Sequence, residues 1–123
     1  RPSLAASSKM PPDEAFERVQ YEMTNANGGI AYMRNQIESG DFAALLDFTK
    51  TYDQNLRKTA MGGLKTVIVD KSRATELANA VTFDLIGINR NSRPGQENKE
   101  GASKYLNELV DDVNAFLALE RVQ

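Results

Sequence analysis

The sequence of 123 residues contains no cysteine, no histidine and no tryptophan. Without cysteine it cannot form disulfides, thiolate metal sites, iron–sulfur clusters or a thiol nucleophile. Without histidine it lacks the commonest general base and the commonest protein ligand of metals and haem, and its serines have no ordinary base to activate them. We therefore expect a protein that is not an enzyme, with no catalytic residue, no cofactor and no metal site.

Long apolar runs are also missing. No segment approaches the roughly 20 residues that a membrane-spanning helix needs, and none has the charged start and apolar centre of a signal peptide. The formal net charge is -2, whereas nucleic-acid-binding proteins are usually basic overall. We expect no nucleic acid partner and no membrane span. Since the first residue is Arg1 rather than methionine, a processed product and an arbitrary chain boundary are both open interpretations.

Apolar residues recur at alternating steps of three and four in four stretches of the sequence. This spacing places them on one side of a helix and is typical of helix-on-helix packing. The sequence therefore predicts an all-α protein, an up-down-up-down four-helix bundle. The four apolar seams are Phe16, Val19, Met23, Ala26, Ile30, Met33 and Ile37; Phe42, Leu45, Thr49, Tyr52 and Leu56; Ala74, Leu77, Val81, Leu85 and Ile88; and Ala102, Leu106, Leu109, Val113 and Phe116.

The chain length suits a single domain. Residues 1–11 are small and polar with prolines, and predict a flexible N-terminal arm before the bundle at 12–123. Gly28 and Gly29 lie inside the first helix and predict a kink or a close helix approach, but the seam stays in register and favours one helix. The β-branched run at 67–69 is expected to be a helix end or a buried turn. The helices are predicted at about 12–38, 41–66, 72–90 and 97–119.

Two acidic features were candidates for unusual chemistry. Asp111 and Asp112 are adjacent, so their side chains point about 100° apart on a helix and are expected on a solvated face. Asp84 flanks the third seam, where a carboxylate can acquire an altered pKa. A surface-edge aspartate is the favoured interpretation of Asp84. Neither feature predicts an active site.

Several apolar residues are predicted to face outward. Tyr21 and Tyr32 fall opposite the seam of the first helix, and Phe83 and Ile86 fall opposite the third seam, near Arg90. Isolated exposed hydrophobic residues are common on soluble proteins, but aromatic residues beside arginine are favoured interface anchors. Phe83, Ile86 and Arg90 are therefore candidate partner-binding residues.

The middle of the chain is locally basic. Residues 50–73 hold six bases against Asp53 and Asp70 in a chain that is acidic overall. Such a group either keeps a bundle soluble or steers it onto an acidic protein surface. Insertion of an amphipathic helix into a membrane is a third interpretation, disfavoured because the seams should cover one another. The basic residues are Lys50, Arg57, Lys58, Lys65, Lys71 and Arg73.

Three stretches of the sequence carry a family resemblance: FTKTYDQNLRK at 48–58, DKSRATEL at 70–77 and YLNELVDDVNAFL at 105–117. They resemble the PsbQ-like extrinsic subunits of photosystem II, and most closely the related small extrinsic protein of diatoms and other red-lineage algae. The resemblance covers about residues 12–119. It rests on the helix pattern and on scattered residues within these stretches.

The resemblance implies a four-helix protein of the chloroplast thylakoid lumen that lies on the lumenal side of photosystem II. Such a protein binds core subunits and other extrinsic proteins, and helps to retain calcium and chloride near the manganese cluster of the oxygen-evolving complex. It contributes no catalytic group or metal ligand, reaches the thylakoid membrane only through protein contacts, and is expected to be a monomer when free. The short arm at 1–11 differs from the longer one of green-plant members, whose docking role is therefore not carried over.

Family members dock largely through lysine and arginine, so the resemblance singles out Arg57, Lys58, Lys65, Lys71 and Arg73. A second hypothesis is a helical interaction module unrelated to photosynthesis, which would bind its partner through the outward-facing apolar residues of the third helix. A third hypothesis, a ligand-carrying bundle, requires an internal cavity that the mostly large seam residues do not favour.

Overall fold

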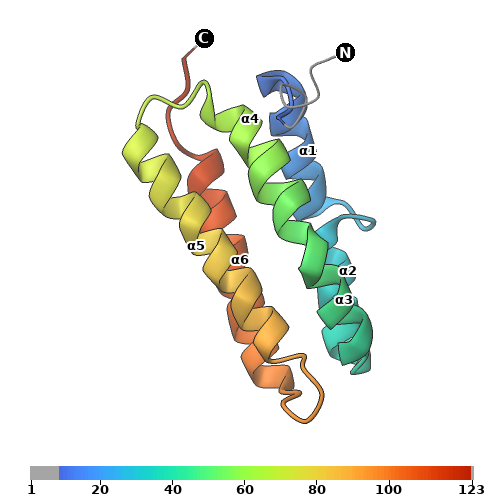
Figure 1. Ribbon diagram of the computed structural model, residues 1–123. Helices are drawn as coiled ribbons and strands as arrows, with labels where there is room; N and C mark the ends of the chain where they lie inside the picture. Colours follow the sequence, from blue (N-terminus) through green and yellow to red (C-terminus); the bar gives the residue numbers. More distant parts are fainter. Residues whose placement is uncertain (1–8, 123) are drawn as a thin grey trace, which may run out of the picture.

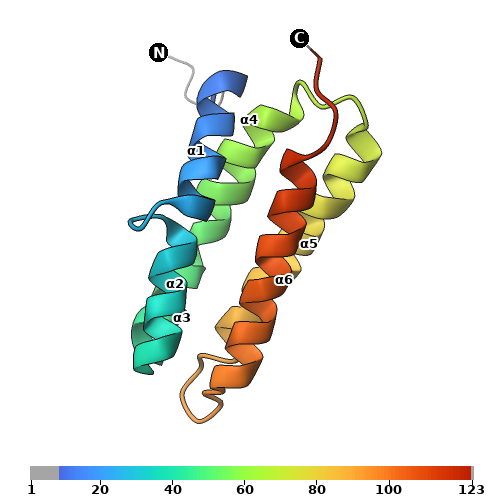
Figure 2. The ribbon, with the colours of Figure 1, turned by 180° about the vertical axis from the view of Figure 1, so that it is seen from behind.

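The computed structural model describes residues 9–122, which form an all-helical bundle of four rods (Figure 1). Seen from behind, the first rod packs beside the second, and the third beside the fourth (Figure 2). The first rod consists of α1 (Pro12–Thr24) and α2 (Gly29–Ser39), the second of α3 (Phe42–Asp53), the π-helical segment η2 (Gln54–Met61) and α4 (Gly62–Lys65), the third of α5 (Lys71–Arg90) and the fourth of α6 (Lys99–Leu117).

The predicted seams form the core. Every residue of the third and fourth seams is buried, as is the second seam apart from Phe42, which is partly buried against the core. In the first seam Phe16 and Met23 are partly buried, whereas Ala26 is exposed. The three-and-four spacing thus identifies the buried side of each rod, with one error at Ala26.

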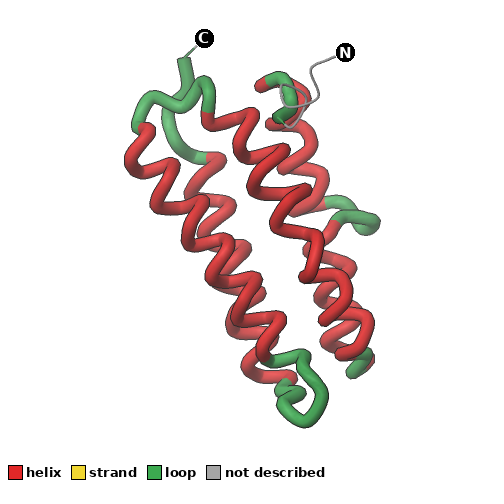
Figure 3. Tube along the Cα trace, in the orientation of Figure 1, coloured by secondary structure: helices red, strands yellow, loops and turns green. Residues whose placement is uncertain are grey.

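The prediction of one helix over 12–38 is wrong. The chain leaves the helical conformation at Asn25 and returns to it at Gly29, so a loop separates α1 from α2 (Figure 3). Within this loop the Gly28 N–H donates to the Asn25 carbonyl oxygen at 2.8 Å. The interruption is about one helical turn long, and the apolar residues on its two sides therefore stay in phase.

The second rod is helical from Phe42 to Lys65, close to the predicted 41–66, but its middle is a π-helix. Gly40, with φ 75°, ends α2 in the left-handed conformation that favours glycine. Asp41 then caps α3 by accepting from the Ala44 N–H at 3.1 Å. The π-helix was not predicted, and such segments are frequent at functional sites.

The run at 67–69 is a turn, and it pairs with the end of the chain. The Val69 N–H donates to the Glu120 carbonyl oxygen at 2.9 Å, and the Val122 N–H donates to the Val67 carbonyl oxygen at 2.8 Å. These bonds flank an isolated antiparallel bridge between Ile68 and Arg121. The expectation of a helix end or a buried turn at 67–69 did not include this pairing with the short segment that follows α6.

The predicted arm over 1–11 is described only from Lys9 onward, and residues 1–8 lie outside the described part of the chain. The Met10 N–H donates to the Thr59 carbonyl oxygen at 3.1 Å. The Met10 backbone also lies so close to Gly63 that a Cβ there would overlap the Met10 carbonyl oxygen. The described end of the predicted arm thus contacts the bundle at Met10, and α1 begins at Pro12, where the bundle was predicted to begin.

Within residues 9–122 no helix combines the length and apolar character that crossing a membrane requires.

Candidate functional site

Three of the predicted partner-binding residues lie on the outer side of α5. Phe83, Ile86 and Arg90 are spaced three and four residues apart, which places them on one face of the helix. Phe83 is 68% exposed and Ile86 39% exposed, and Arg90 is exposed as well. Phe83 and Ile86 therefore form an exposed apolar stripe on α5, and Arg90 adds a positive charge at its end.

Two hydrogen bonds fix the position of this stripe beside α3. The Thr82 hydroxyl donates to Asp53 Oδ1 at 2.8 Å, and Asn89 Nδ2 donates to the Thr49 hydroxyl at 3.0 Å. Ile86 lies between Thr82 and Asn89 in the helix. The stripe therefore borders the contact between α5 and α3 and is held in place from both ends.

Arg57 differs from the other basic residues at 50–73 because two hydrogen bonds pair its charge with a carboxylate. Its Nε and NH2 groups donate to the two oxygens of Asp53 at 2.8 and 2.7 Å. Burial alone would raise the pKa of Asp53, but the hydrogen bonds from Arg57 and Thr82 outweigh it and hold this pKa below its ordinary value. The same bond to Asp53 raises the pKa of Arg57. Arg57 thus joins η2 to α3 instead of offering a free charge.

The remaining bases are exposed or lie near the junction of α4 and α5. Lys71 Nζ donates to the Lys65 carbonyl oxygen at 2.6 Å, and Lys65 Nζ donates to the Thr75 hydroxyl. Arg73 pairs with Glu76 at 3.3 Å, with side chains 51% and 69% exposed, and such surface pairs contribute little. The structure therefore brings Lys65 and Lys71 together, and Arg73 follows Lys71 by two residues in α5.

Lys58 stands apart from that junction, exposed on η2. Lys71, Arg73 and the apolar stripe share one element, because α5 begins with Lys71 and ends with Arg90, whereas Lys65 is the last residue of α4. At about 1.5 Å per residue Lys71 and Arg90 are about 28 Å apart. Lys71 and Arg73 are two residues apart and so point about 160° apart around α5, on different sides of the apolar stripe. We refer to these residues of α5, together with Lys65 at the junction with α4, as the α5 surface: Lys65, Lys71, Arg73, Phe83, Ile86 and Arg90.

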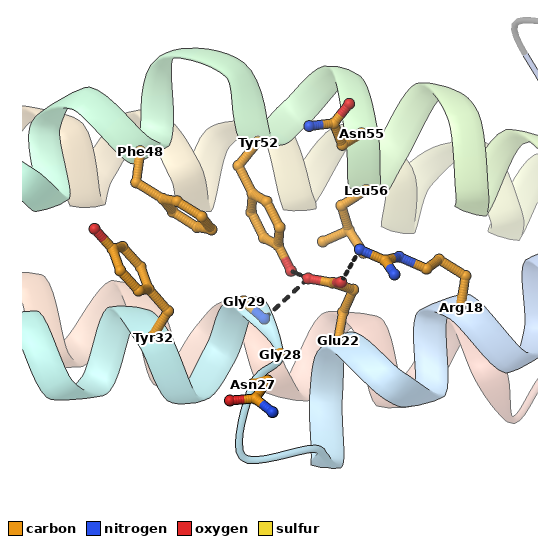
Figure 4. A pocket seen from close by; sticks show the side chains of 10 residues that line it. All are labelled: Arg18, Glu22, Asn27, Gly28, Gly29, Tyr32, Phe48, Tyr52, Asn55 and Leu56. Carbon is orange, nitrogen blue, oxygen red and sulfur yellow. Dashed lines mark hydrogen bonds and ion pairs between the residues drawn. The ribbon is translucent and has the colours of Figure 1, made fainter.

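A polar cluster that was not predicted lies at the break between α1 and α2 (Figure 4). Glu22 is only 6% exposed. Its Oε1 accepts hydrogen bonds from the Tyr52 hydroxyl at 2.6 Å and from the Gly29 N–H at 2.9 Å, and its Oε2 pairs with Arg18 at 2.7 Å. Both oxygens of this buried carboxylate are therefore satisfied, as a buried charge requires.

Tyr52 is the donor that reaches this carboxylate from the second rod. Burial, followed by the hydrogen bond to Glu22, raises the pKa of the Tyr52 hydroxyl, so it stays protonated and able to donate. A Cβ on Gly29 would overlap the Tyr52 hydroxyl. The close helix approach predicted at Gly28 and Gly29 is confirmed at Gly29, although the sequence did not indicate which side chain it admits.

The cluster forms the floor of a cavity of about 250 Å³ that opens to solvent. The rings of Tyr32 and Phe48, and those of Phe48 and Tyr52, lie with centroids 4.6 Å apart. Figure 4 shows these rings on one side of Glu22 and Arg18 on the other. Glu22 already has three partners, so its carboxylate holds the two sides of the helix break and the second rod together. It is therefore not free to act as an acid or a base.

A second buried carboxyl corrects the prediction for Asp84. It is 5% exposed and not at a surface edge. Burial first, then a hydrogen bond with Asp112 and the charges of Asp112 and Glu108, raise the pKa of Asp84 to about 8. Asp112 is half-buried, whereas Asp111 is exposed. The predicted solvated face therefore applies to Asp111 and is wrong for Asp112.

Acidic residues in the described part of the chain form no group of three or more that could hold a metal ion. Comparison with known proteins finds no matching protein family, no similar curated sequence and no similar solved structure. The case for a site therefore rests on the geometry of the chain's own residues.

Proposed function

We propose that the protein is a nonenzymatic extrinsic subunit that docks on the lumenal face of photosystem II in the chloroplast thylakoid lumen. In this role it stabilises the manganese cluster and supports retention of calcium and chloride through contacts with core subunits and other extrinsic proteins. The proposal starts from the resemblance of residues 48–58, 70–77 and 105–117 to the PsbQ-like subunits.

The observation that carries the proposal is the α5 surface. Three bases lie at or near the α4–α5 junction, and an apolar stripe headed by Phe83 follows on the same helix. A group of charges of one sign steers a protein onto an oppositely charged surface. Exposed aromatic residues beside arginine then anchor the interface once it has formed. A surface of this kind suits docking on an acidic protein face.

One of the three resembling stretches contributes residues to this surface, and the other two lie in elements that contact α5. Residues 70–77 open α5 and include Lys71 and Arg73, while 105–117 lie in α6, the helix that packs along α5. The stretch 48–58 includes Arg57 and Asp53, which bond to each other, and Asp53 also accepts a hydrogen bond from Thr82 of α5. The resembling stretches therefore supply Lys71 and Arg73 of the candidate surface and contacts that position α5.

We infer in addition that the four rods run up-down-up-down. Gly40 and Asp41 alone separate α2 from α3, and two residues span at most about 7 Å. Lys71 Nζ reaches the Lys65 carbonyl oxygen across the second connection. In the third, the Asn98 N–H donates to the Asn91 carbonyl oxygen at 2.9 Å. Each connection thus joins neighbouring rod ends, which supports antiparallel neighbours.

The second candidate function is a helical interaction module unrelated to photosynthesis. It is favoured by the exposure of Phe83, 68%, on a helix that is otherwise well packed. In this case the apolar stripe rather than the bases would supply most of the binding free energy.

The test is cosedimentation of the protein with photosystem II particles stripped of their extrinsic proteins, at rising salt, with oxygen evolution measured on each pellet. Saturable binding that salt releases and that restores oxygen evolution is the expected result. Absence of binding at low salt, with the protein folded and the other extrinsic proteins restored, would overturn the assignment to photosystem II.

Matched variants separate the two functions. Replacing Lys65, Lys71 and Arg73 by glutamine should weaken binding at low salt. Replacing Lys50, Lys99 and Lys104 by glutamine, the same change in net charge elsewhere, should leave binding nearly unchanged. Binding that does not change with salt concentration, and that is lost when Phe83→Ser and Ile86→Ser are combined, would instead support the interaction module.

A further inference from the structure

Asp84 lies in a tightly packed part of the bundle, between α5 and α6. Gly87, one turn further along α5, receives the ring of Tyr105, which a Cβ at this position would overlap. This close approach excludes solvent around the neighbouring turn of α5. Asp84 is consequently 5% exposed, and its Oδ2 has no hydrogen-bond partner in residues 9–122.

The groups that face Asp84 from α6 are acidic. Asp112 lies within hydrogen-bonding reach of the Asp84 carboxyl, and Glu108 adds a second negative charge nearby. The closest base on that helix, Lys104, is 68% exposed and lies 3.9 Å from Glu108. No cation from α6 therefore offsets the charge that Asp84 would carry if it ionised.

The other elements packed against α5 are α3 and η2. Their titratable groups on this side are Asp53 and Arg57, which bond to each other, and Asp53 also bonds to Thr82. Thr82 precedes Asp84 by two residues and so points about 160° away around the helix. The charged groups of the second rod therefore lie on the opposite side of α5 from Asp84.

An ionised carboxylate in this position would be desolvated, unpaired and beside a second carboxylate. Each of these conditions disfavours the charged form. A single proton between two such groups removes the repulsion and supplies the donor that the unpartnered oxygen lacks. Two carboxyls that face each other in a dry interface thus bind a proton together.

We propose that Asp84 and Asp112 form a proton-binding site between α5 and α6, in which the protonated Asp84 carboxyl donates a hydrogen bond to Asp112. The ligand of this site is a proton. No covalent chemistry is involved, and the site is independent of whether the α5 surface docks on photosystem II.

The sign of the effect follows from the raised pKa of Asp84, about 8 against an ordinary 3.8. Between these two values the native state keeps a proton that the unfolded chain releases. The contribution of the site to stability is therefore complete at or below about pH 4 and declines until about pH 8. Within this range the unfolding equilibrium constant rises by up to about tenfold per pH unit.

The direct test is a carbon-13 NMR titration of the Asp84 side-chain carboxyl, assigned through the backbone of the wild-type protein. A midpoint more than two pH units above the ordinary aspartate value is expected. A midpoint at the ordinary value would overturn the proposal, because a carboxyl that ionises so readily does not retain a shared proton.

Variants supply a second test. Denaturant unfolding at about pH 5 and about pH 7 should give a change in the unfolding constant about a hundredfold larger for wild type than for Asp84→Asn, whose side chain cannot ionise. Asp111→Asn, an exposed neighbour of the site, is the matched control and should behave like wild type. Equal pH dependence in wild type and Asp84→Asn would contradict the proposal.

A third variant covers the case in which Asp84→Asn does not fold. Asp112→Asn keeps Asp84 buried but removes the facing charge, so the NMR midpoint of Asp84 should move down. A midpoint that stays in place would show that Asp112 does not take part, and the two-residue site would be wrong.

Discussion

The hydroxyl of Tyr52 donates a 2.6 Å hydrogen bond to the carboxylate of Glu22, thirty positions earlier in the chain. This bond joins the end of α1 to α3, at the level where the first rod is interrupted and the second turns π-helical. Glu22 lies three residues before the break and Tyr52 two residues before the π-helix. The bond therefore joins the two rods beside both irregular segments.

The Tyr52–Glu22 bond should contribute measurably to stability. Tyr52→Phe removes the donor and leaves a buried carboxylate with one partner fewer, which should lower the free energy of unfolding by about 1–3 kcal/mol in denaturant titrations. Tyr32→Phe is the matched control, because Tyr32 is 37% exposed and lines the same cavity. It should cost less than about 0.5 kcal/mol. Equal losses in the two variants would show that the bond contributes nothing.

Adjacent glycines in the second rod should respond in opposite ways to alanine. A Cβ on Gly62 would have its closest neighbour, in the Lys9 side chain, at 3.5 Å, so Gly62→Ala should stabilise by up to about 1 kcal/mol through helix propensity. A Cβ on Gly63 would overlap the Met10 carbonyl oxygen. Gly63→Ala should therefore lower the melting temperature and weaken protection of the Met10 amide in hydrogen exchange. Stabilisation by both substitutions would mean that Met10 does not pack on α4.

The Asp53–Arg57 pair should make the protein sensitive to acid. The pKa of Asp53 is held below its ordinary value of 3.8, so its contribution is present above that value and is lost as the pH falls towards the pKa of the folded state. From about pH 5 to about pH 2, Asp53→Asn should lose less stability than wild type, by about 1 kcal/mol. Asp47→Asn, an exposed change in the same helix, serves as the control. Identical acid unfolding of wild type and Asp53→Asn would rule out the depressed pKa.

Phe83 and Phe116 should differ sharply although both are phenylalanines on packed helices. Phe83 is 68% exposed and Phe116 fully buried. Phe83→Ser should change the free energy of unfolding by less than about 0.5 kcal/mol, whereas Phe116→Ala should cost about 3–5 kcal/mol. A large loss for Phe83→Ser, measured by denaturant unfolding, would indicate that this ring packs within the protein and is not free for a partner.

The core could be predicted from the sequence because a seam depends only on spacing along one helix. Val81, Leu85 and Ile88 lie where their spacing puts them, whatever helix covers them. The break at residues 25–28 escaped the same reasoning because its length keeps the flanking residues in phase. Periodicity detects which side of a helix is buried, and it cannot detect an interruption that preserves that side.

Buried polar groups were harder to predict because their surroundings come from other helices. Asp84 sits beside its seam, and only the approach of α6 decides between a surface edge and a dry interface. Glu22 likewise depends on a tyrosine of the second rod. The exposure of Phe83 and Arg90 was easier to predict, since their positions opposite a seam follow from helix geometry alone.

The end of the chain and the start of α1 lie at the same end of the bundle (Figures 1 and 2). The Arg121 guanidinium lies 4.5 Å from the centroid of the Phe16 ring, so the last described residues contact the first helix. Ends that lie close together suit circular permutation. A linker that joins Val122 to Lys9, with new ends opened at the exposed Gly95 between α5 and α6, would reorder the rods along the chain while keeping their packing, and would place the new ends away from the α4–α5 junction.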